Sequence, residues 1–334
     1  MMKKTYTRKN TIFATSLFIM VTRRFLRIKV LQALYAAEKN KKEDFAAGAK
    51  KLDQAVQNCQ VLSVYFLSLL PEIVHYRSIR LAELKEKINP TQDDLNPNTK
   101  FIDNKVIKQI GENTDIKQFC VNHKIDWSDR YDFIAQMYNE IANSDLYSKY
   151  LNTPEQNYNE DKDFVRKILT EIFSESELLH WFLEEKNVHW FDDYNDALLA
   201  AYKNIDKFKE NQANNIALIP LFKNDEEIIF YKELFRKTLL YNAEYQKKID
   251  EKLQRWESER IMEIDTILMK MAMCELTQFQ TIPVKVTINE YIELAKLYSS
   301  RKSGVFINGI LDSVVTDFKN EGKLNKIGRG LINN

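Results

Sequence analysis

Three closely spaced arginines, Arg23, Arg24 and Arg27, carry the strongest chemical signal in the chain. On a helix Arg23 and Arg27 lie one turn apart, and Arg24 lies about 100° round from Arg23. Cations in a first turn oppose the helix dipole, and like charges at i and i+4 repel, at costs of about 0.3–1 and 0.2–0.5 kcal/mol. A phosphate that accepts hydrogen bonds from guanidinium groups removes both penalties. The cluster therefore predicts a binding site for RNA or DNA.

Two other roles for the arginines stay open. Acids elsewhere in the fold could pair with them, or they could be the positive flank of the apolar run Ile12–Val21 that precedes them. A net charge of +1 argues against a protein that coats nucleic acid without specificity, but it allows a local basic patch.

The elements that position these arginines are predicted to be helices throughout. The 334 residues include only 7 Gly and 6 Pro, which leaves few residues suited to tight turns. Long amphipathic runs are common, and alternating Val/Thr-rich stretches are nearly absent. We therefore assign an all-α fold.

The segment Ile282–Asp312 predicts two consecutive helices. Thr287 can cap the first, with Glu290 three residues later completing a capping box, so we expect this helix to start at Thr287. A second helix is expected to open near Ser303, with Phe306 outside its buried stripe. The residues of that stripe are Ile307, Ile310, Leu311, Val314 and Phe318.

This segment resembles the carboxyl-terminal signature of the NusB family of bacterial transcription antitermination factors. Arg23–Tyr35, which ends in Gln-Ala-Leu-Tyr, is similar to the family's arginine-rich first helix. Phe230–Leu239, Trp256–Arg260 and Asp265–Leu276 look like its central helices. The resemblance covers roughly 22–40 and 226–320, and it implies a NusB-like helical bundle interrupted by an inserted helical region.

The resemblance implies an RNA-binding surface for the boxA element of ribosomal RNA leader transcripts. It assigns RNA contacts to Arg23, Arg24, Arg27 and Gln32 in the first helix, and to Lys302 and Phe306 at the start of the last. Phe25 stands where relatives often have a basic residue, and Lys302 replaces an acid seen in some of them. Phe306 could stack on an unpaired base, with core packing as its other role.

The resemblance also implies protein partners. These are NusE, a small-subunit ribosomal protein, and the antitermination complex of RNA polymerase. Asp265 is carried over as a NusE contact, and a solvated first-turn acid is its other reading. A homodimer of the free protein stays open.

The remaining segments are assigned as follows. Residues 41–225 form the insertion, with five or six helices and a kink or break at Pro71. Residues 321–334 are expected to form a flexible tail. Residues 1–21 read as a non-native or disordered extension, with Met20 as the expected true start, and we expect a cytoplasmic protein without a membrane span.

Enzymatic chemistry finds no support in the sequence. It contains no glycine-rich phosphate loop, no nucleophile–base constellation and no metal-ligand spacing, so neither catalysis, cofactor nor metal is expected. Cys59, Cys120 and Cys274 read as reduced thiols, and the His180–Tyr194 region as structural packing. Two rival functions remain: a helical scaffold that binds a protein partner through the insertion, and an enzyme with its site around His180–Tyr194.

Overall fold

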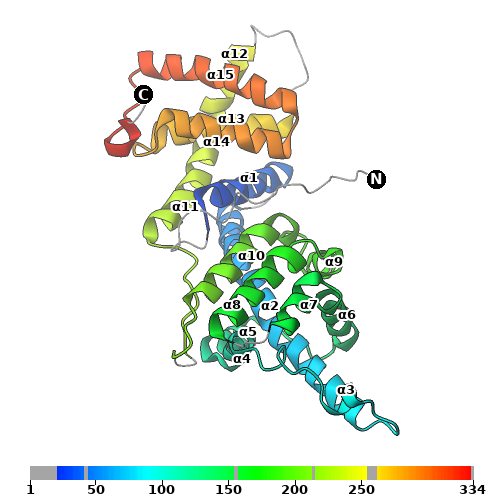
Figure 1. Ribbon diagram of the computed structural model, residues 1–334. Helices are drawn as coiled ribbons and strands as arrows, with labels where there is room; N and C mark the ends of the chain where they lie inside the picture. The colour runs from blue at the N-terminus through cyan, green and yellow to red at the C-terminus, as the bar shows by residue number, and fades with distance from the viewer. Residues whose placement is uncertain (1–20, 41–43, 154–156, 213–214, 254–261, 332–334) are drawn as a thin grey trace. The chain divides into compact units, whose positions relative to one another are not determined.

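The computed structural model describes the chain except for residues 1–20, 41–43, 154–156, 213–214, 254–261 and 332–334. Within the described ranges it consists of helices, with no strand, which confirms the all-α assignment (Figure 1). Residues 1–20 of the extension, which include the Met20 start, and all of the predicted helix Trp256–Arg260 fall outside the described residues. The chain separates into two compact units: unit 1, Gln57–Lys223, and unit 2, Thr22–Val56 with Asn224–Asn334.

Unit 2 is built around a central buried helix, α13 (Glu263–Gln278). Every residue from Ile267 to Leu276 is buried, because α13 packs against five other helices of the unit, α1, α11, α12, α14 and α15. Those helices are α1 (Arg23–Lys39), α11 (Asp225–Leu240), α12 (Asn242–Leu253), α14 (Val284–Tyr298) and α15 (Arg301–Asn320). The first turns of α2 (Phe45–Lys85) also belong to this unit, where Phe45 stacks on Phe235.

Unit 1 contains the rest of α2 and a set of shorter helices. They pack through aromatic side chains: Phe66 meets Tyr194 edge-on, and His180 stacks on Tyr194. This confirms the predicted packing role of His180. The helices are α3 (Gln92–Leu95), α4 (Lys105–Glu112), α5 (Thr114–His123), α6 (Tyr131–Ala142), α7 (Asp145–Asn152), α8 (Tyr158–Lys167), the π-helix Ile168–Phe173, α9 (Glu177–Lys186) and α10 (Trp190–Lys207).

We predicted a kink or a break at Pro71, and helix α2 runs through this residue as one helix, so there is no break. Among the described residues it is the one helix long and apolar enough to cross a membrane, but 61% of its apolar window is buried in the protein, as in a core helix.

Helix α14 begins at Val284, after Pro283, and not at Thr287 as predicted. The Thr287 side chain is fully buried and faces the core of unit 2 instead of capping a helix end. The prediction for the next helix is close: α15 begins at Arg301 with a capping box between Ser300 and Ser303, and the whole predicted stripe is buried. Helix α15 packs along α14 (Figure 1).

The segment 323–331, which we expected to be a flexible tail, is anchored on unit 2. The Lys326 ammonium donates to the backbone carbonyls of Glu275 and Phe279, and the Ile327 amide donates to the carbonyl of Gln280. Gly330 follows in a short 3₁₀ turn, Gly328–Leu331. A Cβ at Gly330 would lie 2.0 Å from the Gln280 carbonyl oxygen, so only glycine fits there.

Candidate nucleic-acid interface

The amino-terminal end of α1 presents the predicted arginines. The Thr22 hydroxyl caps the helix by accepting from the Phe25 amide at 3.1 Å. Phe25, Leu26 and Val30 are buried, and α1 packs on α11 and α13. The apolar face thus fixes the helix and leaves the Arg23 and Arg24 side chains 38% and 40% exposed.

Arg27 lies inside the unit and not on its surface. Its Nε and Nη2 each donate to the Glu275 carboxylate at 2.8 Å, and the two side chains are 3% and 0% exposed. The Thr287 hydroxyl donates to the same carboxylate at 2.9 Å and the Tyr291 hydroxyl at 3.2 Å. We call Arg27, Glu275, Thr287 and Tyr291 the buried cluster. The guanidinium has no surface left for a phosphate, so the prediction that Arg27 contacts RNA directly is not retained.

The pKa values within the buried cluster agree with this pairing. Burial by itself would lower the pKa of Arg27, but the charge of Glu275 and its hydrogen bonds outweigh burial and raise the pKa above the ordinary arginine value. Burial and the adjacent Glu275 carboxylate raise the pKa of Tyr291 well above its ordinary value. Arg27 therefore stays charged, and Tyr291 stays a hydroxyl donor.

Arg24 forms a second bidentate ion pair nearer the surface. Its Nε and Nη2 donate to the Glu290 carboxylate at 2.9 and 2.7 Å, and the Glu290 side chain is 20% exposed. Arg27 Nη1 lies 3.5 Å from the same carboxylate. Burial would raise the pKa of Glu290, but the hydrogen bond from Arg24 and the charges of Arg27 and Arg24 hold it below the ordinary value. Glu290, predicted to cap α14, is thus the anionic partner of α1.

Arg23 is held more loosely. Its guanidinium lies over the Phe230 ring, 5.2 Å from the centroid, and its Nη2 is 3.8 Å from a Glu226 carboxylate that is 73% exposed. Such an exposed pair is worth little, about 0–1 kcal/mol. Pairing with acids elsewhere in the fold, which the sequence left open, therefore applies firmly to Arg24 and Arg27 and only weakly to Arg23.

The other predicted contacts have different degrees of exposure. Lys302 is exposed in the first turn of α15, and Phe306 is half-buried outside the buried stripe. Gln32 is half-buried and accepts from Lys29 at 3.4 Å. Within the described part of the chain, no hydrogen bond or ion pair joins Lys302 to the arginines of α1. Asp265 is only 3% exposed near the start of α13, so the predicted partner contact through it is not retained.

Sequence reasoning missed Glu275, the residue that organises the buried cluster. A signal was present, because Glu275 interrupts the apolar run Ala272–Leu276. A carboxylate in a helix that is buried all round needs a charged or hydrogen-bonding partner, and unpaired arginines elsewhere in the sequence are candidates for it.

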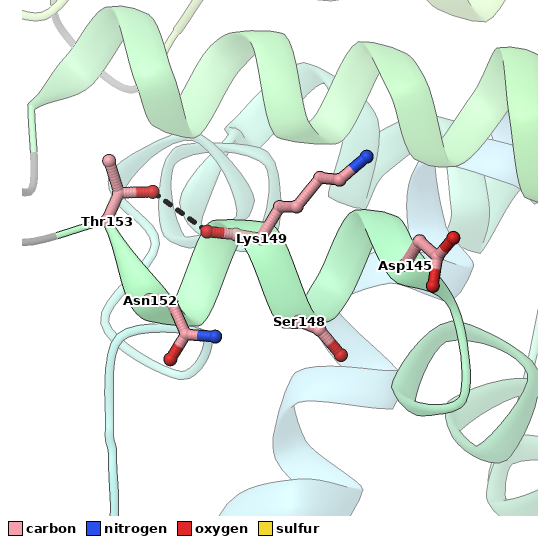
Figure 2. A pocket seen from close by; sticks show the side chains of 5 residues that line it. All are labelled: Asp145, Ser148, Lys149, Asn152 and Thr153. Atoms are coloured by element: carbon pink, nitrogen blue, oxygen red, sulfur yellow. Dashed lines mark hydrogen bonds between the residues drawn. The ribbon is translucent and has the colours of Figure 1, made fainter.

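The described residues offer no metal centre: they contain no group of three or more His, Cys, Asp or Glu arranged to hold an ion. A pocket on α7 has no arrangement of side chains suited to catalysis (Figure 2). The five residues that line it, Asp145, Ser148, Lys149, Asn152 and Thr153, come from this one helix and its carboxyl-terminal end. The hydrogen bond among them joins the Thr153 hydroxyl to the Lys149 carbonyl, as at an ordinary helix end.

Unit 2 is thus an all-helical unit whose first helix carries three arginines, two of them partly exposed and one paired in the core. Comparison with known sequences is more specific. Residues 195–316 match the sequence model of the NusB family. No solved structure matches the chain.

Curated relatives agree. The chain is 39% identical over 134 residues to the transcription antitermination protein NusB of Salinibacter ruber, covering 40% of this chain and 84% of that protein. It is 31% identical over 111 residues to NusB of Listeria welshimeri, covering 32% and 87%. With NusB of Chloroherpeton thalassium it shares 48% identity over 77 residues, 23% of this chain and 36% of the relative. The chain belongs to the NusB family of transcription antitermination proteins, which are not enzymes.

Proposed function

We propose that this chain binds single-stranded boxA-like RNA together with the NusE ribosomal protein, and that the assembly travels with RNA polymerase in the cytoplasm to keep transcription of ribosomal RNA operons processive. The observation that carries the proposal is Arg23. It is a half-exposed arginine that lies over Phe230 and is paired only loosely with Glu226. A phosphate can therefore replace Glu226 as its partner at a small cost in free energy.

Lys302 and Phe306 form the second part of the proposed surface. They occupy the first two turns of α15, where an exposed ammonium can pair with a phosphate and an aromatic ring at the edge of the buried stripe can stack on a base. Gln32 would contribute a hydrogen bond. We assign Arg27 a positioning role, because its buried cluster fixes α1 to α13 and α14.

The relationship of the two units is part of the proposal. Unit 2 holds the arginines, the central helices and the carboxyl-terminal signature, so we infer that it is the NusB-like core. Unit 1 would then be a helical insertion between the first helix and the rest of that core.

The test is binding of boxA RNA and a scrambled control to the purified chain, with and without NusE, over a salt series. The variant Arg23→Ala/Lys302→Ala should weaken boxA binding and make the dependence of log K on log salt shallower by about 1.4, roughly 0.7 for each lost phosphate contact on a single strand. Arg236→Ala/Lys319→Ala removes the same two kinds of charge from unit 2, on α11 and at the far end of α15, and should leave boxA binding nearly unchanged. Equal, weak binding of both RNAs by all proteins would refute the proposal.

A second candidate function, a protein-binding scaffold, is favoured by a groove in unit 1. The groove has a volume of about 740 Å³ and lies between the start of α6 and α9. Its floor includes the Phe133 and Phe182 rings, stacked with centroids 4.1 Å apart. Tyr131 and Trp181 line it while 49% and 60% exposed. Exposed aromatic residues of this kind are typical anchors of protein interfaces.

The scaffold function predicts a separable defect. Tyr131→Ala/Trp181→Ala should reduce recruitment of the chain to an antitermination complex assembled from purified components, while its affinity for boxA RNA alone stays unchanged. Unchanged recruitment would remove the support for this second candidate.

A further inference from the structure

We propose that Glu290 lowers RNA affinity by competing with phosphate for Arg24. This inference rests on the proposed function. In the free protein the Glu290 carboxylate occupies the Nε and Nη2 edge of the guanidinium, and an RNA phosphate gains that bidentate contact by displacing it. Glu290 therefore acts as a built-in anionic competitor on the RNA-binding helix.

The geometry of the ion pair supports competition. Glu290 takes Arg24 Nε and Nη2 together, at 2.9 and 2.7 Å, and a phosphate commonly binds arginine with the same bidentate geometry. Both side chains reach the surface, with 40% and 20% exposure. An incoming phosphate can therefore approach Arg24, but it meets a guanidinium whose Nε and Nη2 edge is already paired and whose charge is offset by Glu290.

Glu290 is also held in place from the protein side. Arg27 Nη1 lies 3.5 Å from the Glu290 carboxylate, and Arg27 itself is fixed by two hydrogen bonds to Glu275. The carboxylate thus has a second, buried cation beside it in addition to Arg24. When Arg24 turns to a phosphate, Glu290 still faces the charge of Arg27.

Support of the fold is a weaker explanation for Glu290, since the buried cluster already supplies that support. The cluster joins α1 to α13 through Arg27–Glu275, and α13 to α14 through Thr287 and Tyr291. None of these hydrogen bonds involves Glu290. Its removal frees Arg24 while the connection between the three helices persists.

The two accessible arginines consequently differ in how readily a polyanion can use them. Arg23 faces an exposed Glu226 at 3.8 Å and is available to any RNA. The bidentate edge of Arg24 is available to an RNA whose other contacts hold a phosphate against it strongly enough to displace Glu290. An RNA that fits the rest of the surface meets this condition and bears the cost of breaking the ion pair, whereas a scrambled RNA makes less use of Arg24, so the ion pair lowers affinity chiefly for the RNA that fits.

The test compares Glu290→Gln with wild type in RNA binding. Glutamine keeps the shape of the side chain and removes its charge. We expect a gain of roughly two- to fivefold for boxA RNA, the factor that a partly exposed ion pair is worth, and an equal or smaller gain for scrambled RNA. Where scrambled RNA gains a phosphate contact at Arg24, its salt dependence should steepen by about 0.7.

Glu233→Gln is the matched control, because Glu233 pairs with Arg236 and Lys237 on α11 and its loss changes the net charge of unit 2 by the same amount. It should leave the affinity for boxA RNA close to the wild-type value. Adding Arg24→Gln to Glu290→Gln should abolish the gain. Glu290→Asp, which keeps the charge but shortens the bidentate contact, should show a smaller gain and provides the test if the glutamine variant is unstable.

Two results would overturn the inference. One is weaker binding of both RNAs by well-folded Glu290→Gln, which would make Glu290 a support of the site. The other is an equal effect of Glu290→Gln and Glu233→Gln, which would show a general effect of charge. In either case selective boxA binding that depends on Arg23 and Lys302 would leave the proposed function standing, whereas absence of selective binding in wild type would defeat that function itself.

Discussion

Arg27 and Glu275 form a buried bidentate ion pair that ties the first helix of unit 2 to its central helix. The residues are 248 positions apart in the sequence, and both hydrogen bonds are 2.8 Å long. Taking two charges out of water is costly, and Thr287 and Tyr291 offset part of that cost by donating to the same carboxylate. The pair thus fixes α1, with its exposed arginines, at a defined place on the unit.

Loss of one partner from this pair should strongly destabilise the protein. Arg27→Met leaves the Glu275 charge buried without its partner, and we expect the free energy of unfolding to fall by about 3–5 kcal/mol. Glu275→Met should cost a similar amount, and Arg27→Met/Glu275→Met much less than the sum. Urea denaturation of the four proteins measures the coupling. A stable Arg27→Met protein that has lost RNA binding would contradict the buried, positioning role of Arg27.

The Tyr291 hydroxyl tests the cluster without removing a charge. Tyr291→Phe keeps the ring and deletes the donor to Glu275, so stability should fall by about 1.5–3 kcal/mol, as for a hydrogen bond to a charged group. The same substitution at the exposed Tyr35 is a suitable control and should change stability little. Equal effects of the two substitutions would show that the hydroxyl of Tyr291 contributes nothing specific.

Gly330 should tolerate no side chain. An alanine Cβ would overlap the Gln280 carbonyl oxygen at 2.0 Å, so Gly330→Ala should displace the 3₁₀ turn and cost about 1–3 kcal/mol. Gly304→Ala lies in α15, where the new methyl meets its neighbours at 3.6 Å or more, and should stabilise by about 0.5–1 kcal/mol. Thermal unfolding that moves in the same direction for both variants would argue against the anchored tail.

The buried Lys326 should make the stability of the protein depend on pH. Burial lowers the pKa of its ammonium from 10.5 to about 8, against a partial offset from Glu275. Between these values the unfolded chain carries a proton that the folded protein lacks, so raising the pH favours folding through this group. Wild type should therefore gain stability relative to Lys326→Met between pH 7.5 and 10, measured by urea denaturation. A difference that is flat or reversed over this range would contradict the assigned pKa.

Periodicity and composition were enough to predict the helical class and the stripe of α15, because both depend on local patterns. Helix ends were less predictable. Residues 41–225 were expected to hold five or six helices, but their described part holds more. Asn113 and Ser144 cap α5 and α7 by accepting from backbone amides, and these caps separate α4 from α5 and α6 from α7. The apolar pattern continues across each cap, so only the hydrogen bonds of the fold show the division.

The partners of the arginines could not be predicted from local sequence. Thr287 and Glu290 have the spacing of a capping box, but tertiary contacts use both side chains: Thr287 for Glu275, and Glu290 for Arg24. The pair of Arg24 and Glu290 forms only because α1 and α14, 266 positions apart in the sequence at these residues, lie side by side. Some residues of the site could therefore be predicted from the sequence, but their hydrogen bonds and ion pairs could not.

Ultraviolet cross-linking of boxA RNA to the wild-type protein in the presence of NusE, followed by mass spectrometry of the cross-linked peptides, tests the central claim most directly. The account predicts cross-links in the peptides that contain Arg23 and Phe306, and their loss with scrambled RNA. Cross-links confined to Gln57–Lys223, or equal with both RNAs, would contradict an RNA-binding surface formed by α1 and the start of α15.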